Sequence, residues 1–165
     1  MEDNKIKVKY VDPIQNITTN PFFASRLLHS FFTGYDKENA SLNLIYLVLP
    51  LVFYRSSRNL LVTAKSTSSL RSLFVDDSVK ATSLGGLQER ILYFEKISNQ
   101  ALIIAVNDEK MKLDVEGITL KKTFDYKSIL NQNVKDYCRA AYYLGLLCSR
   151  TELANIYRLL GVTLV

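Results

Sequence analysis

The stretch from Asn20 to Tyr54 most constrains what this chain can fold into, because it joins an amphipathic helix to an almost wholly apolar segment. Asn20 is a favourable N-cap, and Pro21 is suited to the first helical position, where its missing N–H costs nothing. On a helical wheel the apolar side chains share one half-circle: Phe23, Ala24, Leu27, Leu28, Phe31, Phe32 and Tyr35. We therefore expect a helix that buries one face and ends at Gly34. His29 should project from the opposite, polar face.

The following segment, Leu42 to Tyr54, contains a single polar residue, Asn43. A membrane-spanning helix needs about 20 apolar residues, so a segment of this length is typical of a buried core element instead. Its leucines favour a helix, and Pro50 should bend that helix because proline removes a backbone donor. We expect a central kinked helix against which the Phe-rich helix packs, with Leu47 fully enclosed.

Two flanking regions carry positive charge. Residues 5–11 alternate lysine with Ile6, Val8 and Tyr10, which predicts a half-buried strand at a sheet edge or a docking arm within residues 1–19. The stretch RSSRNLLVTAKSTSSLRSLF, residues 55–74, predicts two short helices, each capped by serine or threonine. Its cations leave two interpretations open, a solvated surface or a phosphate-facing patch: Arg55, Arg58, Lys65 and Arg71.

Residues 78–122 predict a winged-helix-like unit. Apolar residues at helical spacing up to Phe94 are followed by a break at residues 96–98, and Ser98 can cap a second helix. The segment MKLDVEGITLKK then alternates around Glu116-Gly117, which indicates a β-hairpin that turns at the glycine. Helix, turn, helix and hairpin is the order found in winged-helix units.

The last third of the chain, residues 133–163, predicts two further helices that end at Gly161. Cys138 and Cys148 fall in one helix about 15 Å apart, too far for a disulfide, which favours buried thiols in a reducing compartment. The N-terminus lacks the apolar core of a signal peptide, so we expect a cytoplasmic protein. With 165 residues, the chain predicts a single domain, 1–165, that is mainly α with a small β-hairpin (α+β).

The sequence offers no catalytic, cofactor-binding or metal-binding constellation. It contains no G-x-x-x-x-G-K-[ST] motif, and its only histidine, His29, has no nucleophile motif with it. One His and two distant Cys cannot build a zinc site. A nuclease site could be drawn from acids followed by a lysine, but such spacing arises often by chance. Its members would be Asp76, Asp77, Asp108 and Lys110.

The predicted wing leaves two uses open. The preceding helix, Asn99 to Asn107, carries no cation, which disfavours sequence-specific DNA reading. Non-specific DNA contact stays open through the lysines that flank the wing: Lys110, Lys112, Lys121 and Lys122. We favour protein docking through the apolar residues of the wing: Leu113, Val115 and Ile118.

The run NPFFASRLLHSFFTGY followed by LIYLVLPLVFY resembles the middle component of bacterial three-component ABC-type defence systems, the group that includes Lamassu. Further pieces agree in order: STSSLRSLF, then NQALIIAVNDEKMKLDVEG, then a closing helix that ends ANIYRLLGV. The resemblance covers residues 18–163 and rests on packing motifs, none of which is catalytic.

This resemblance implies a non-catalytic accessory subunit in an anti-phage complex. The subunit would join an SMC/Rad50-like ATPase to a toxic effector, often a nuclease, in a hetero-oligomeric complex without a membrane. It would need no cofactor of its own and would meet DNA only indirectly or non-specifically. The alternative from a different class is a winged-helix DNA-binding protein or transcriptional regulator.

Overall fold

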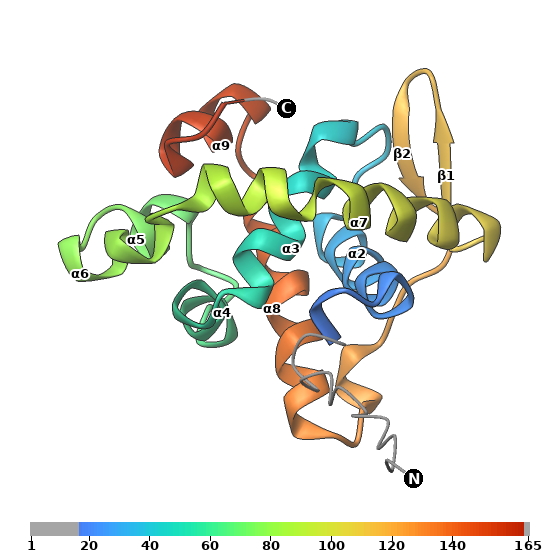
Figure 1. The fold of residues 1–165 in the computed structure, drawn as a ribbon, viewed down its shortest axis with the longest axis horizontal. Helices are drawn as coiled ribbons and strands as arrows, with labels where there is room; N and C mark the ends of the chain where they lie inside the picture. Colours follow the sequence, from blue (N-terminus) through green and yellow to red (C-terminus); the bar gives the residue numbers. More distant parts are fainter. Residues whose placement is uncertain (1–16, 164–165) are drawn as a thin grey trace, which may run out of the picture.

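The computed structural model describes residues 17–163, and the strand predicted for residues 5–11 lies outside them. Helices dominate, and the described strands form one antiparallel pair, which confirms the expected mainly α fold with a small hairpin (Figure 1). The α-helices are α2 (Pro21–Tyr35), α3 (Ile45–Phe53), α4 (Arg55–Val62), α5 (Leu70–Phe74), α6 (Ser78–Ala81), α7 (Leu87–Asn107), α8 (Gln132–Cys148) and α9 (Leu153–Leu160). The strands are β1 (Met111–Asp114) and β2 (Gly117–Leu120), and the 3-10 turns are η1 (Leu42–Leu44), η2 (Thr82–Leu84) and η3 (Tyr126–Ser128).

Helix α2 begins as its sequence predicts but is buried on both faces. Asn20 Oδ1 accepts hydrogen bonds from Phe22 N (2.9 Å) and Phe23 N (3.3 Å). The expectation that His29 projects into solvent is wrong, because its side chain is only 7% exposed. Helix α8 packs against the polar side of α2, where Ser30 Oγ donates to the carbonyl oxygen of Cys138 (2.7 Å). Because the hydroxyl side chains on the polar side of α2 are small, α8 can cover this side, which the helical wheel predicted to face solvent.

Gly34 does not end α2. The helix continues through Tyr35, and Asp36 closes it in a left-handed conformation (φ 47°). Gly34 is instead buried at the point where α2 crosses α8, and Gly145 of α8 lies at the same crossing. Both glycines therefore serve the close approach of two helices.

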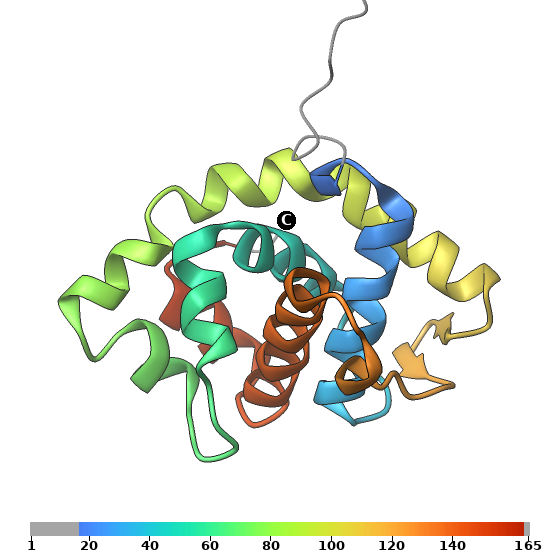
Figure 2. The same ribbon diagram turned by 90° about the horizontal axis from the view of Figure 1, so that it is seen from below.

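The apolar segment forms η1 followed by α3, with Pro50 inside the helix as predicted. Leu47 is 0% exposed, which confirms its expected enclosure. Seen from below, α7 runs along one side of the molecule over α2 and α3, while α8 lies between α2 and α4 (Figure 2). The centre of the molecule is thus shared by α2, α3 and α8.

Helix α7 is continuous over 21 residues, so the expected break at residues 96–98 is wrong. Its buried positions continue at helical spacing through the supposed break: Leu87, Ile91, Phe94, Ser98, Ala101, Leu102 and Ala105. Ser98 is fully buried within this row and caps nothing. The helix–turn–helix order is therefore absent from residues 87–107, and the winged-helix assignment stays a prediction supported by the helix and hairpin alone.

The hairpin has the predicted position, with Leu113 opposite Ile118 and Asp114 opposite Gly117. Ala40, from the loop after α2, pairs with Ile118 through two backbone hydrogen bonds of 2.9 Å each. At Gly117 (φ 137°) a Cβ atom would lie 2.5 Å from the carbonyl oxygen of Ala40. Glycine is therefore required both for the backbone conformation and for this close contact.

Candidate interaction surfaces

The hairpin extends beyond the body of the molecule and exposes two of the three predicted docking residues (Figure 1). Val115 is fully exposed (104%) at the turn, and Leu113 is 44% exposed on β1. Ile118 is 0% exposed, because its side of β2 packs on the core while its backbone pairs with Ala40. Ile118 is thus a residue that anchors the hairpin, and its predicted role in docking is wrong.

Two of the four lysines assigned to non-specific DNA contact have acidic neighbours. Lys110 Nζ lies 2.7 Å from Asp108 Oδ2, and Lys112 Nζ lies 2.9 Å from Asp114 Oδ2. The hydrogen bond from Lys112 lowers the pKa of Asp114 below its usual value. Lys121 and Lys122 are exposed after β2. Acidic side chains therefore offset part of the positive charge of the hairpin.

The outer face of α7 is a second apolar surface, which the sequence analysis missed. Leu92 (57% exposed), Tyr93 (65%) and Ile103 (59%) all turn away from the core. Leu92 and Ile103 lie on the same side of the helix, because 11 residues is close to three full turns, and Tyr93 lies next to Leu92. Dividing α7 at residues 96–98 hid this alignment. The spacing of exposed apolar residues along an unbroken helix would have revealed it.

The acids considered for a nuclease are not brought together. Asp77 caps α6 by accepting from Val79 N (2.8 Å), and Asp76 lies 3.8 Å from Arg71. Asp108 follows α7, so the whole helix, about 30 Å long, separates it from this pair. Within residues 17–163, no group of three or more His, Cys, Asp or Glu side chains is placed to hold a metal ion.

The remaining reactive side chains are buried in the core. His29 Nε2 donates to the carbonyl oxygen of Lys122 (2.6 Å), and burial lowers the pKa of the imidazole. Burial raises the pKa of the Cys138 and Cys148 thiols to about 12, so neither is a thiolate near neutral pH. His29 thus ties α2 to the segment after β2, and all three groups are buried away from a substrate.

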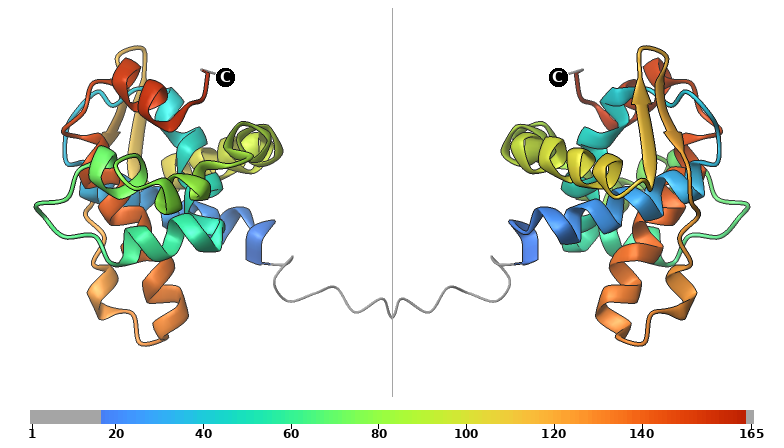
Figure 3. Two further views of the ribbon diagram at one scale, coloured as in Figure 1. Left: turned by 90° about the vertical axis from the view of Figure 1, so that its left-hand side faces the viewer. Right: turned by 90° about the vertical axis from the view of Figure 1, so that its right-hand side faces the viewer.

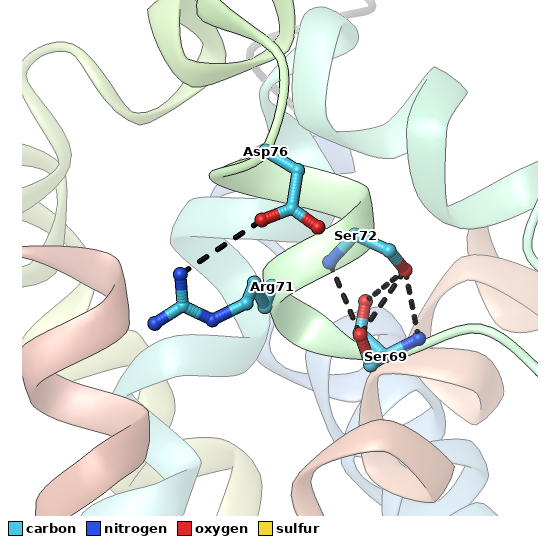
Figure 4. Close-up of polar contacts among 4 residues, drawn as sticks. All are labelled: Ser69, Arg71, Ser72 and Asp76. Atoms are coloured by element: carbon cyan, nitrogen blue, oxygen red, sulfur yellow. Dashed lines mark hydrogen bonds and ion pairs between the residues drawn. The ribbon is translucent and has the colours of Figure 1, made fainter.

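The short helices after α3 differ in how they begin. Helix α4 follows Tyr54 without a side-chain cap, so its predicted serine cap is wrong. Helix α5 has the predicted cap: Ser69 and Ser72 each accept from the other's backbone N–H (Figure 4). In the same view Arg71 reaches toward Asp76, with both side chains exposed. Such an exposed pair contributes little to stability.

A family model for Middle Component 3 of ABC-three component (ABC-3C) systems matches residues 8–164. The chain belongs to this family. No curated protein and no solved structure matches it. The matched region contains every helix and strand described above, so both apolar surfaces of this Middle Component 3 protein are part of the family domain.

Within the described residues of this Middle Component 3 protein, no helix is both long and apolar enough to cross a membrane. The two apolar surfaces lie on different sides of the domain. In side view the hairpin extends away from α7, which runs along another side of the domain (Figure 3).

Proposed function

We propose that this protein is a non-catalytic accessory subunit that joins an SMC/Rad50-like ATPase to a toxic effector in a Lamassu-like anti-phage complex in the cytoplasm. Its membership of the Middle Component 3 family supports the coarser part of this assignment. We expect the effector to be a nuclease.

One observation carries the bridging role: large apolar side chains are exposed both on the hairpin and on α7, in addition to single exposed residues such as Phe22 and Leu130. Clustered exposed apolar residues mark protein contact sites, and aromatic and aliphatic anchors dominate the binding energy of interfaces. The hairpin offers Leu113 and Val115, and α7 offers Leu92, Tyr93 and Ile103. Neither surface is part of the core that holds the domain together, so each is free to bind.

The test is co-purification of the tagged chain with the products of its neighbouring genes. Leu113→Asp with Val115→Asp should release one partner, and Leu92→Asp with Ile103→Asp should release the other, because a carboxylate in an apolar contact is left without compensation. Val79→Asp is the matched control, since Val79 is 76% exposed on α6, outside both surfaces. Replacing Lys112, Lys121 and Lys122 by glutamine should leave assembly intact.

Failure would take a recognisable form. If neither double variant releases a partner, the two apolar surfaces are not the docking sites. If the wild-type chain retains no neighbouring gene product and instead binds a palindromic operator near its own gene, the transcriptional regulator is the correct alternative.

A further inference from the structure

A third surface of the molecule has a different chemistry from the two apolar ones. Residues 55–72 carry four cations and contain neither an acidic nor an aromatic residue. These residues form α4, the loop after it and the start of α5. The acid-free part of the chain extends further, from Asn39 to Val75. A local charge imbalance of this kind is absent from the hairpin, where Asp108 and Asp114 pair with lysines.

The fold adds further cations to this surface from α8, which packs against α4 (Figure 2), and from the turn that follows α8. Arg139 Nε donates to the carbonyl oxygen of Val62 (2.8 Å), at the end of α4. Arg150 donates to the carbonyl oxygen of Ser66 in the loop. Each of these bonds uses part of a guanidinium group, which has five N–H donors in all. Arg139 and Arg150 therefore border the loop, while Asp136 of α8 lies near Arg58 and Val62.

Not every cation here is available to a ligand. Arg58 donates to the carbonyl oxygens of Val52 (3.1 Å) and Phe53 (2.9 Å) and stacks 4.3 Å from the ring centre of Tyr137. It is therefore part of the fold. Arg55 and Lys65 are exposed and form no ion pair within residues 17–163, and Arg71 has only its exposed contact with Asp76. We call Arg55, Lys65, Arg71 and Arg150, with the exposed hydroxyls of Ser56 and Thr67, the basic face.

The composition of the basic face distinguishes a phosphate ligand from a protein. Arginine, lysine, serine and threonine side chains make most contacts to nucleic-acid phosphates. A protein interface would also need apolar anchors at its centre, and residues 55–72 include no exposed large hydrophobic side chain. Single strands are held by stacking bases on aromatic rings. Residues 55–72 have none, and the neighbouring rings of Tyr54, Tyr137 and Tyr143 each already stack with an arginine of this chain. Duplex backbone is the ligand that fits.

We propose that the basic face binds the sugar–phosphate backbone of duplex DNA without reading its sequence. A duplex carries one negative charge per about 1.7 Å of axis, so cations on the neighbouring α4, its loop and α5 can meet several phosphates of one duplex. This contact is independent of the proposed bridging role, since it uses neither the hairpin nor the outer face of α7. It places DNA on a different surface from the lysines of the hairpin.

The experiment measures binding of the full chain to a fluorescent 30-base-pair duplex by anisotropy, at 50 and 200 mM salt. The wild type should bind, and binding should weaken steeply with salt. The triple variant Arg55→Gln, Lys65→Gln, Arg71→Gln should lose about tenfold or more in affinity at 50 mM salt. Its salt slope should fall by roughly one for each phosphate that is no longer neutralised. All three side chains are exposed, so thermal unfolding of this variant should match that of the wild type.

Two controls make the outcome specific. Replacing Lys112, Lys121 and Lys122 by glutamine removes the same charge elsewhere and should change affinity by less than about threefold. Arg55→Lys with Arg71→Lys keeps the charge and should retain binding, because contact with phosphate does not require a guanidinium. The proposal is overturned if the wild type shows no salt-dependent binding or if the hairpin triple variant loses as much affinity. The proposal is also overturned if the basic-face variant keeps its affinity for DNA but no longer binds the ATPase or the effector. In that case the basic face would be a contact for an acidic protein.

Discussion

Gly34 of α2 and Gly145 of α8 form a reciprocal contact at which two helix backbones touch. A Cβ atom on Gly34 would lie 1.9 Å from the carbonyl oxygen of Tyr142, and one on Gly145 would lie 1.9 Å from that of Phe31. Both clashes involve backbone, which cannot move aside as a flexible side chain can. The buried bond from Ser30 Oγ to the Cys138 carbonyl depends on the same close packing. This crossing therefore determines how α8 covers the polar side of α2.

Gly145→Ala should lower the free energy of unfolding by about 1–3 kcal/mol or more, because overpacking forces the helices apart. This destabilisation is opposite to the usual effect, because alanine in place of glycine inside a helix normally stabilises a protein by about 1 kcal/mol. Denaturant unfolding measures the change, and Gln100→Ala on the exposed side of α7 should shift it by less than about 0.5 kcal/mol. A stabilised Gly145→Ala protein would mean that α2 and α8 do not touch here.

Leu47→Ala should cost roughly 2–5 kcal/mol, because the leucine is completely enclosed and its truncation leaves a cavity. Leu92→Ala makes the same chemical change at a side chain that is 57% exposed, so its cost should be far smaller. The comparison uses denaturant unfolding of the isolated chain. Equal costs for the two variants would show that α3 is not the core helix or that the outer face of α7 is buried in the free protein.

His29 should make stability fall as the pH decreases through the range just below neutrality. Burial lowers its pKa below 6.5, and the nearby charge of Lys110 adds to this, while the bond to the Lys122 carbonyl opposes it. Between the folded pKa and 6.5 the unfolded chain binds more protons, so stability is full above pH 6.5 and is lost as the pH drops toward the folded pKa. Unfolding measured from pH 7.5 to 5.5 should show this slope. His29→Gln keeps a donor for Lys122 and should remove the slope; a slope unchanged in this variant would assign it to other groups.

The purified chain should neither hydrolyse ATP nor cut DNA in the presence of Mg²⁺ or Mn²⁺. Asp76 and Asp77 precede α7 and Asp108 follows it, so the whole helix separates the acids that a nuclease would need. Asp108 also forms an ion pair with Lys110. Gel assays with plasmid and linear duplex, alongside a phosphate-release assay, measure both activities. Metal-dependent cleavage that is abolished by Asp108→Ala would contradict the accessory role and restore the nuclease hypothesis.

Features with a local cause could be predicted from the sequence. The Asn20 cap, the burial of Leu47 and the turn before Gly117 each depend on side chains close in the chain. Helix geometry alone predicted that Cys138 and Cys148 would not form a disulfide with each other, and both are free thiols. Short-range patterns of this kind therefore predict single caps, turns and buried positions, although they placed a break in α7 that the structure does not have.

Features that depend on another segment could not be predicted in this way. The polar residues on one side of α2 predicted a solvent-exposed face. Helix α8 covers this face instead, because serine and glycine are small enough to allow close packing. Ser98 resembles a helix cap in sequence but is one more buried position of α7, and Ile118 is anchored by distant Ala40. The error at Ser98 explains why the exposed face of α7 was missed, and the error at Ile118 explains why one docking residue too many was predicted.

The central claim is that this subunit holds two partners together, and its most direct test is reconstitution with and without it. A tagged ATPase from the neighbouring gene should retrieve the effector only when this chain is present, and the eluted complex should contain all three proteins by size-exclusion chromatography with light scattering. Of the double variants Leu113→Asp, Val115→Asp and Leu92→Asp, Ile103→Asp, one should leave the tagged ATPase alone, because it breaks the contact with the ATPase. The other should leave the ATPase bound to this chain but without the effector. Retrieval of the effector by the ATPase in the absence of this chain would contradict the account.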